Sequence, residues 1–285
     1  MVGVQLEPMI IDGKPIAEEL LADLKPKLAA LPAGRFLGAA VVGEDPASLN
    51  FLKQKEKVAR ELGVDFRLYK LAANITTDDL RREIGRYAGP KNCGGFLVQL
   101  PLPEHLSNKH YILNAIPKEK DVDLLSEAAL GAFYTGRHAI VPPAVAALEE
   151  ILKRHYSKDL RQATVAVIGA GILIGRPIGF WLQNRVAELM VFDSRSKNLH
   201  ERLIEADIIV SGAGSPGLFS AKHLAKGALV IDFGYSKGSD GRLAGDFDPT
   251  GADEKKIAYT KTPGGTGPIL VAELFGNLLK LNEIR

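Results

Sequence analysis

Strand-like and helix-like segments alternate along the chain, and this alternation constrains the fold more than any other feature of the sequence. In the amino-terminal half, short apolar runs typical of strands alternate with amphipathic segments of helical periodicity. Helices are expected at residues 16–30, 47–63 and 77–87, and strands at residues 36–42, 64–71 and 95–100. Strands that are separated by helices run parallel and are covered by those helices. We therefore expect an α/β fold.

The same alternation returns in the carboxyl-terminal half. A helical connection leads into a new series of strands, which are expected at residues 164–168, 189–192, 208–211 and 229–233. This order is typical of a doubly wound, Rossmann-type nucleotide-binding domain. A Gly- and Pro-rich stretch at 262–268 then precedes a last helix at 269–281. We expect that helix to return to the first domain.

The expected organisation is therefore two lobes with a cleft between them. An α/β catalytic domain is expected from residues 1–141 plus 269–285, and the nucleotide-binding domain from residues 142–268. A chain of 285 residues, 46% hydrophobic and 25% charged, is long enough to form two such globular domains.

Charge and cysteine content exclude several classes of function. The net charge of +2 and the lack of Arg/Lys clusters with interleaved aromatics speak against a nucleic-acid partner. Residues Met1 to Ile11 lack the pattern of a signal peptide, and no apolar run approaches membrane-spanning length. We expect a cytoplasmic protein without a membrane partner. The single cysteine, Cys93, excludes an internal disulfide and a thiolate-rich metal site, and no metal is expected.

Lys55 lies on the apolar side of the helix expected at 47–63. At about 100° per residue, Phe51, Lys55 and Val58 share one face, whereas Lys53 points away. A lysine on an apolar face loses hydration, and this lowers its pKa toward the range that a catalytic acid or base needs. The alternative is that Lys55 extends along the edge of this face to water, and periodicity alone favours that alternative.

A glycine turn follows the strand expected at 164–168. It has the pattern Gly169-x-Gly171-x-x-x-Gly175 and leads into a helix. Glycines at such a turn let the backbone approach a pyrophosphate, which the free amides of the helix amino terminus bind. Tight turns also use glycine for steric reasons alone, but Asp193 ends the next strand at a spacing suited to the ribose 2′-hydroxyl of NAD. We therefore expect dinucleotide binding.

The residues after Asp193 bear on the choice of cofactor. Ser194 and Arg195 are able to receive the 2′-phosphate of NADP, whereas the carboxylate of Asp193 would repel it. We expect NAD, with NADP as the alternative.

Two polar features stand out in the amino-terminal half. Gln99 is a polar side chain near the carboxyl end of an apolar strand, where parallel α/β folds place their ligands. Residues Lys120 to Asp123 put two carboxylates, Asp121 and Asp123, into one loop. Such a loop is often only a turn, but one carboxylate is also suited to a heterocycle that carries adjacent N–H donors.

These residues carry a family resemblance. The chain resembles the bifunctional methylenetetrahydrofolate dehydrogenase/cyclohydrolase family, known as FolD, along nearly its whole length. The matching segments are residues 11–14, 43–48, Phe51 with Lys55, 98–102, 120–123, Gly169 with 175–177, 206–208, 230–234, 245–246 and 263–268.

The resemblance implies the following roles. The lysine matching Lys55 serves the cyclohydrolase step, the glutamine matching Gln99 positions it, and the aspartate matching Asp123 binds the pterin. The family's aromatic residue at Phe51 stacks on the folate, and Pro263, Gly264 and Gly265 are expected to bind substrate. Gly169, Ala170, Gly171, Gly175, Asp193, Ser194 and Arg195 are expected to bind the cofactor. The family also implies tetrahydrofolate substrates and a homodimer.

Several positions depart from the family pattern. Phe51 stands where the family usually has tyrosine, so a hydroxyl is lost. Ala170 replaces an arginine expected to hold the NADP 2′-phosphate, and Asp193 replaces a common histidine, so two changes favour NAD. Leu124 replaces the glycine that usually follows the folate carboxylate, and Lys261 adds a charge near the expected cleft.

Three hypotheses remain open at this point. The first is an active folate enzyme whose dehydrogenase step is more secure than its cyclohydrolase step. The second is a two-lobed dehydrogenase of another small molecule, similar to shikimate dehydrogenase, against which Gln99 and Asp123 argue. The third is a divergent family member that binds folate or nucleotide with little or no turnover, against which the joint presence of Lys55, Gln99 and Asp123 argues.

Overall fold

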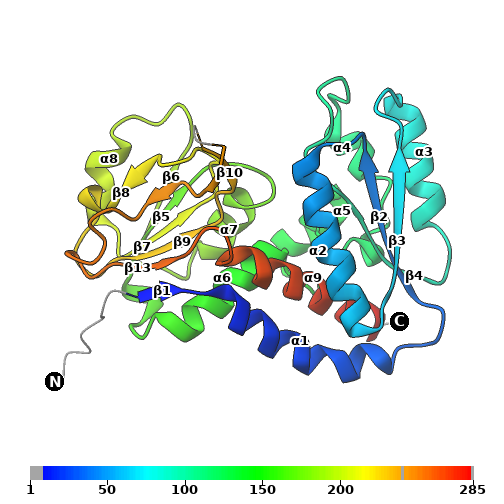
Figure 1. Cartoon of the computed structure of the whole chain (residues 1–285), viewed down its shortest axis with the longest axis horizontal. Coiled ribbons are helices and arrows are strands. Elements are labelled where there is room, and N and C mark those ends of the chain that lie inside the picture. Colours follow the sequence, from blue (N-terminus) through cyan, green and yellow to red (C-terminus); the bar gives the residue numbers. More distant parts are fainter. Residues whose placement is uncertain (1–8, 239–240, 284–285) are drawn as a thin grey trace. The chain divides into compact units, whose positions relative to one another are not determined.

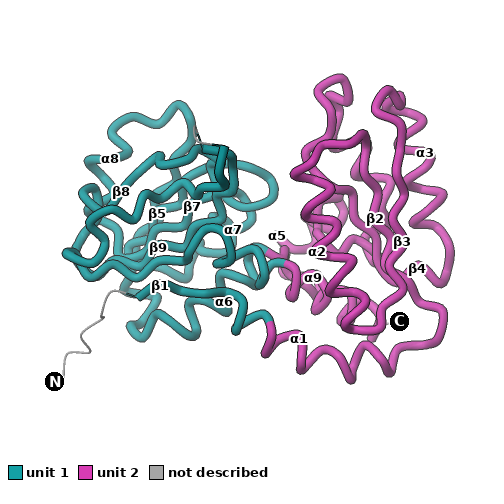
Figure 2. Tube along the Cα trace, in the orientation of Figure 1, with its two compact units in different colours: residues 1–17, 144–270 teal, residues 18–143, 271–285 magenta. Residues whose placement is uncertain are grey.

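The protein folds into two compact α/β units, each built from two separate stretches of the chain. A computed structural model describes residues 9–238 and 241–283 (Figure 1). Unit 1 comprises Met1–Ala17 and Ala144–Leu270, and unit 2 comprises Glu18–Pro143 and Val271–Arg285 (Figure 2). The expected α/β class with a Rossmann-type domain is confirmed. Residues 1–8, part of the segment in which no signal peptide is expected, lie outside the described residues.

Unit 1 is built on a parallel sheet of six strands in the order β1-β13-β9-β7-β5-β6. These strands are β1 Met9–Ile11, β5 Thr164–Ile168, β6 Glu188–Phe192, β7 Ile208–Ser211, β9 Leu229–Asp232 and β13 Ala258–Thr260. From β5 the chain adds β6 on one side and β7 on the other, so β5 lies where the strand order reverses. In doubly wound folds this reversal marks the ligand-binding edge, at the carboxyl ends of the strands.

The remaining elements of unit 1 connect or extend this sheet. They are the helices α6 Pro143–His155, α7 Gly175–Leu182 and α8 Leu199–Arg202, the 3₁₀ helices Leu160–Gln162, Leu203–Glu205 and Ala221–His223, and the short strands β8 Phe219–Ser220, β10 Ser236–Lys237, β11 Leu243–Ala244 and β12 Phe247–Asp248. Strand β10 pairs with β11 in a hairpin, and β12 pairs with β8. A buried apolar cluster that includes Phe192, Leu203, Phe219 and Val230 packs against this sheet.

Unit 2 contains a parallel sheet of three strands in the order β3-β2-β4. Its elements are most of α1 Gly13–Ala29, then β2 Phe36–Val42, α2 Pro46–Leu62, β3 Asp65–Leu71, α3 Thr77–Ala88, β4 Cys93–Val98, α4 Lys109–Leu113, the 3₁₀ helix Lys118–Lys120, α5 Glu127–Tyr134 and most of α9 Thr266–Glu283. Every residue of the central strand β2 is buried, as is every residue of the edge strand β4.

Local sequence signals fix the ends of α2, which carries Lys55. The Asp45 carboxylate accepts a hydrogen bond from the Ser48 N–H at 2.8 Å, and Pro46 occupies the first turn. At the other end Gly63 adopts the left-handed conformation, with φ of 73°, that commonly terminates a helix. The observed helix therefore begins and ends within one residue of the expected range 47–63.

The amino-terminal strand changes the expected division of the chain. Residues 1–141 were expected to form one domain, but β1 pairs in parallel with β13, with Met9 opposite Ala258 and Ile11 opposite Thr260. Residues 9–17 therefore belong to unit 1. Adjacency in the sequence does not decide the division here, because residues 9–11 pair with a strand near the far end of the chain, which no local pattern reveals. Among the described residues, no helix has both the length and the apolar character needed to span a membrane.

Candidate active site and nucleotide site

Lys55 and Gln99 meet in unit 2. Lys55 projects from α2, and Gln99 directly follows β4, where its N–H donates to the carbonyl of Ala40 at 2.9 Å. The Lys55 Nζ donates to the Gln99 Oε1 at 3.2 Å. The Gln99 Nε2 in turn donates to the Leu100 carbonyl at 2.7 Å. The amide is thus held at both ends, with its oxygen directed at the lysine.

The charge state of Lys55 is set by two opposing influences. Burial, the larger one, lowers the pKa of the Lys55 ammonium, and the carboxylate of Asp123 partly opposes this by raising it. Burial likewise raises the pKa of the Asp123 carboxyl, and Lys55 opposes that shift. The two predicted catalytic residues therefore interact electrostatically within one partly buried site.

The buried side of α2 differs from the expected one. Its fully buried residues are Ser48, Leu52, Ala59 and Leu62, whereas Phe51, Lys55 and Val58 are each half-buried. At about 100° per residue, Lys55 falls among the buried set, while Phe51 and Val58 lie at its edge. The buried face of α2 is rotated relative to the expected one because the helix packs against β2 and β3. Phe51 lies one turn before Lys55, at the border between the core and solvent.

In the loop from Lys120 to Asp123, Lys120 and Asp121 hold the backbone in place. The buried Lys120 donates from Nζ to the carbonyls of Ala88 at 2.6 Å, Gly89 at 2.9 Å and Pro90 at 2.8 Å, at the carboxyl end of α3. This is where the helix dipole favours a cation. Lys120 is thus an anchor for the loop.

Asp121 is the second structural residue of this loop. Its backbone bridges to Phe96 of β4, and its fully buried Oδ2 accepts from the N–H groups of Leu125 at 3.0 Å and Ser126 at 2.7 Å. Burial raises the pKa of Asp121 to about 6. Asp121 therefore holds the start of α5 in place, whereas the less buried Asp123 is the carboxylate predicted to bind a ligand.

Two further features fix the backbone around Asp123. The buried Asn277 of α9 donates from Nδ2 to the carbonyls of Val122 at 3.0 Å and Val141 at 2.9 Å. Leu124, directly after Asp123, is fully buried and has φ of 53°. A non-glycine residue in this left-handed region costs roughly 1–2 kcal/mol. The backbone strain thus lies next to the predicted pterin-binding carboxylate.

In unit 1, the glycine turn lies at the carboxyl end of β5. Gly169 has φ of 103°, and a Cβ on Gly175 would lie 1.8 Å from the Gly169 carbonyl oxygen. These two glycines are therefore required by the turn itself. A Cβ on Gly171 would meet nothing within 4 Å, and Ala170 and Gly171 are both exposed. The turn thus presents open backbone before the amino terminus of α7, as phosphate binding needs.

Asp193 follows β6 and engages Arg195. Arg195 donates from Nε at 3.1 Å and Nη2 at 2.7 Å to Asp193 Oδ2, and its backbone N–H donates to Oδ1 at 2.9 Å. Ser196 Oγ also donates to Oδ1 at 3.3 Å. The hydrogen bonds of Arg195 hold the pKa of Asp193 below its usual value. Ser194 is exposed beside this pair.

The predicted substrate-binding residues are divided between the units. Phe51, Gln99 and Asp123 belong to unit 2, whereas Pro263, Gly264 and Gly265 belong to unit 1. There the Gly264 carbonyl accepts from the Gly13 N–H at 2.9 Å, and Lys261 forms an ion pair with Asp12 at 2.5 Å. The glycine loop is therefore tied to the start of α1. The added charge of Lys261 is paired.

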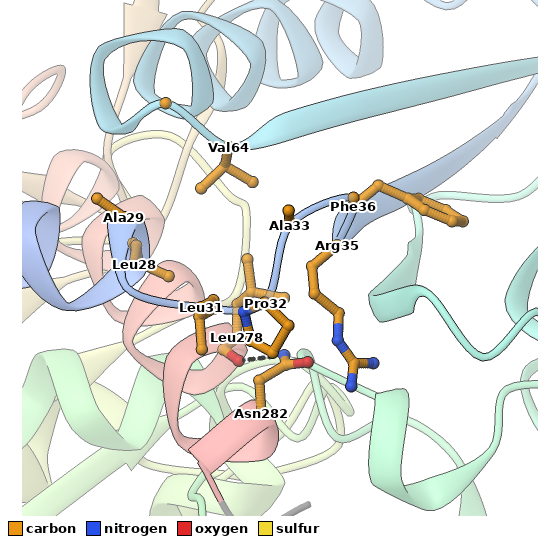
Figure 3. Close-up of a pocket in the computed structure, with 12 residues that line it drawn as sticks. Leu28, Ala29, Leu31, Pro32, Ala33, Arg35, Phe36, Val64, Leu278 and Asn282 are labelled. Carbon is orange, nitrogen blue, oxygen red and sulfur yellow. Dashed lines mark hydrogen bonds between the residues drawn. The ribbon is translucent and has the colours of Figure 1, made fainter.

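Unit 2 also contains a cavity whose lining includes none of the predicted site residues (Figure 3). It has a volume of about 180 Å³ and is lined by residues that include Leu31, Pro32, Arg35, Phe36 and Asn282. Phe36 begins β2, so the cavity lies at the amino ends of the parallel strands, whereas Gln99 follows the carboxyl end of β4. Ligands of open α/β sheets bind at the carboxyl ends. This cavity is therefore not the candidate active site.

The doubly wound sheet of unit 1, with its open glycine turn and an acidic residue after the next strand, defines a dinucleotide-binding protein. Comparison with known proteins identifies the family. Residues 11–123 match the model of the tetrahydrofolate dehydrogenase/cyclohydrolase catalytic domain, and residues 142–285 match that of the corresponding NAD(P)-binding domain. The chain belongs to the tetrahydrofolate dehydrogenase/cyclohydrolase family.

Individual relatives resemble the chain over almost its full length. The bifunctional protein FolD of Staphylococcus aureus is 34% identical over 279 residues, which are 97% of each chain. The solved FolD structure from Campylobacter jejuni superposes with a TM-score of 0.89 at 31% identity and covers 97% of this chain and 99% of its own. The Trypanosoma brucei enzyme, solved with NADP and an inhibitor, has a TM-score of 0.88 at 31% identity, with 98% of each chain covered.

Proposed function

We propose that this protein oxidises 5,10-methylenetetrahydrofolate to 5,10-methenyltetrahydrofolate with a nicotinamide cofactor and hydrolyses the product to 10-formyltetrahydrofolate. The observation that carries this proposal is the hydrogen bond from Lys55 to Gln99 at 3.2 Å, in a site where the charge of Asp123 acts on the same lysine. Full-length similarity to bifunctional FolD proteins supports both activities.

The residues of unit 2 divide the work on the folate. Asp123 accepts hydrogen bonds from the 2-amino and ring N–H groups of the pterin. Phe51, half-buried at the edge of α2, offers its ring to the flat folate rings. The oxidation itself requires a nicotinamide, which accepts the hydride when bound. These contacts hold the one-carbon bridge in place for that transfer.

Lys55 acts in the hydrolytic step. Burial lowers the pKa of Lys55, so at any given pH a larger fraction of its side chains is neutral than for an exposed lysine. The neutral amine can take a proton from the attacking water. Gln99 keeps Nζ in position through its accepting oxygen. Phe51 lacks the hydroxyl of the usual tyrosine, and Lys55 must therefore move the proton without that group.

We propose NAD rather than NADP as the cofactor. The residues present fit a dinucleotide, since Gly171 leaves open space at the turn and the α7 amino terminus follows it. Asp193 is suited to accept a hydrogen bond from the ribose 2′-hydroxyl. A 2′-phosphate would need a cation, but Arg195, the nearest one in the sequence, is already bound to Asp193. Ala170 supplies no charge. The NADP bound to the Trypanosoma brucei relative makes NADP the alternative to test.

One assay tests these proposals together. Purified protein is mixed with methylenetetrahydrofolate and either NAD or NADP, and absorbance follows both the reduced cofactor and the methenyl product. Reduction of NAD with only transient methenyl product supports both steps and the cofactor. Accumulating methenyl product would show a dehydrogenase without hydrolysis. Absence of turnover with folate would leave the alternatives of a binding protein or a shikimate-dehydrogenase-like enzyme, which shikimate as substrate separates.

Two further expectations remain predictions. The homodimer rests on the family resemblance, and light scattering after size-exclusion chromatography tests it. The cytoplasmic location rests on the sequence pattern, and cell fractionation tests it.

A further inference from the structure

A buried carboxylate in unit 1 holds the loop that follows β7. Asp246 is 1% exposed and lies between β11 and β12. Its Oδ2 accepts from the Ser211 Oγ at 2.6 Å and from the Ala213 N–H at 2.7 Å, and its Oδ1 accepts from the Ser215 N–H at 2.7 Å. Both oxygens of one side chain are thus committed to residues 211–215.

That loop packs directly against the glycine turn. A Cβ on Gly169 would lie 2.7 Å from the Gly212 carbonyl oxygen, and a Cβ on Gly212 would lie 2.6 Å from the Ile174 side chain. The Gly212 N–H also donates to the Ile168 carbonyl at 2.8 Å. Residues 213–215 are nevertheless exposed. The loop therefore has a buried, fixed side and an open side next to the phosphate-binding turn.

Sheet order shows which part of a dinucleotide meets this loop. Asp193 follows β6, on one side of β5, and marks the adenosine half of the cofactor. The open backbone of the Gly169 turn after β5 would hold the pyrophosphate. The other half must extend across the reversal of strand order toward the end of β7, where residues 212–215 begin.

We propose that Asp246 is a positioning residue for the nicotinamide half of the cofactor, because it holds the backbone of residues 212–215 in the shape against which that half binds. The inference rests on the proposed dinucleotide function of unit 1. Residues 245–246 belong to the family pattern of the sequence, but no role was expected for them.

The surroundings of Asp246 are shaped to keep it in place. A Cβ on Gly234 would lie 2.4 Å from the Asp246 carboxyl carbon, and a Cβ on Gly245 would lie 2.2 Å from Asp232 Oδ2. Asp246 thus packs against Gly234, two residues after Asp232, and Asp232 packs against Gly245, the residue before Asp246. The Gly217 N–H also donates to the Gly245 carbonyl at 3.0 Å, so the segment of Asp246 holds the loop at a second point.

The test compares two ligands on one variant. Asp246→Asn keeps the shape of the side chain but replaces one accepting oxygen with a donor, which faces a backbone N–H. Titration calorimetry measures the binding of NAD, or of NADP if that binds more tightly, and of AMP, which carries only the adenosine half. We expect the dissociation constant for the dinucleotide to rise about 10- to 100-fold, and that for AMP to stay within about twofold of the unaltered protein.

Two companion variants complete the design. Asp248→Asn is the matched control, since Asp248 is exposed two residues away and bonds only locally to Thr250, and it should bind both ligands normally. Ser211→Ala removes one of the three bonds and should weaken the dinucleotide by a smaller factor. It also decides the matter if Asp246→Asn fails to fold.

The outcomes separate the inference from the function on which it rests. If the unaltered protein binds neither dinucleotide, the proposed function fails. If it binds one, and Asp246→Asn binds it equally well or loses AMP to the same extent, the positioning role is wrong. Normal dinucleotide binding by a folded Ser211→Ala variant, when Asp246→Asn is unfolded, also overturns it.

Discussion

Lys55 and Asp123 act on each other's ionisation in directions opposite to the effect of burial. Burial lowers the pKa of Lys55 and raises that of Asp123, while each charge favours the ionised form of the other. Burial therefore disfavours both charges of this pair, whereas the attraction between them favours both. A change in the charge of Asp123 therefore also changes the proton affinity of Lys55.

Replacing Lys55 should abolish the hydrolytic step alone. Lys55→Met keeps the length of the side chain but removes the proton-transferring group, so hydrolysis of methenyltetrahydrofolate should fall by roughly 100- to 10,000-fold. Nucleotide affinity, measured by calorimetry, should not change. Lys53→Met, on the exposed side of the same helix, is the control. Normal hydrolysis by the Lys55 variant would sink the role assigned to it.

Removing the charge of Asp123 should lower the pKa of Lys55 further, because Asp123 is the influence that raises it. Competitive acetylation followed by mass spectrometry measures the pH at which Lys55 becomes reactive, without requiring substrate to bind. In Asp123→Asn this midpoint should move to lower pH, while labelling of the exposed Lys53 stays the same in both proteins. An unchanged or higher midpoint would show that Asp123 does not act on Lys55.

Asp193→Ala should shift cofactor choice toward NADP. The substitution removes a repulsive carboxylate and releases Arg195, which Asp193 binds through Nε and Nη2. The ratio of kcat/KM for NADP to that for NAD should rise at least about tenfold. Asp159→Ala is a close control, because Asp159 binds Arg161 in the same two-residue arrangement elsewhere in unit 1. Much tighter binding of NADP than of NAD by the unaltered protein would contradict the reading of Asp193.

The left-handed backbone at Leu124 predicts an unusual order of stability. Both Leu124→Ala and Leu124→Gly should destabilise unit 2, since a buried leucine is lost at a cost of roughly 2–5 kcal/mol. The glycine variant should nevertheless be the more stable of the two by about 1 kcal/mol, because glycine adopts positive φ freely. Urea unfolding followed by circular dichroism measures the difference.

The control is the same pair of substitutions at Leu125. That residue is also buried but is not among the positive-φ residues of the described chain. There the alanine variant should be the more stable one. If the alanine variant were the more stable one at both positions, the backbone at Leu124 would not be strained.

Asp232 should make unit 1 lose stability as the pH rises. Burial, aided by the nearby Asp246 charge, raises the pKa of Asp232 to about 7 from its ordinary 3.8. Between these values the unfolded chain releases the proton while the folded chain keeps it, so folding becomes less favourable with each pH unit. From pH 5 to pH 8, Asp232→Asn should gain about 3 kcal/mol of unfolding free energy relative to the unaltered protein.

The single tryptophan, Trp181, makes this measurable. It is 9% exposed and lies on α7 of unit 1, so its fluorescence in urea reports the unfolding of that unit. Asp248→Asn should show a constant difference over the same pH range, because the pKa of the exposed Asp248 is lowered rather than raised. A constant difference for Asp232→Asn as well would show that this carboxyl does not titrate there.

Long periodic segments of the sequence predicted the fold well. Helix α2 was expected almost as it is observed, since Asp45, Pro46 and Gly63 are local end signals. The three-residue strands β1 and β13 were not expected, because so short a segment has no measurable period. Both form by pairing with strands that are distant in the sequence or themselves short, β1 with β13 and β13 with both β1 and β9. For the same reason the pairing of residues 9–11 with the sheet of unit 1 was not expected.

The site was predicted less completely than the fold. The pattern identified Lys55 and Gln99, which the structure brings together. The residue pattern alone did not separate Asp121 from Asp123, since two acids in one loop differ only in the groups that pack around them, and the choice of Asp123 came from the family resemblance. Asp246 was missed because its partners, residues 211–215, are distant in sequence and mostly backbone.

Because each unit is built from two separate stretches of the chain, the order of synthesis determines when each unit can fold. On the ribosome, amino-terminal domains usually fold first. Here the core of unit 2 includes Phe275 and Leu278 of α9, and Asn277 binds the carbonyl of Val122 beside Asp123. Unit 2 therefore waits for residues made after nearly all of unit 1. A nascent chain stalled before residue 271 would contain Lys55 and Gln99 in a unit 2 that still lacks the packing supplied by α9.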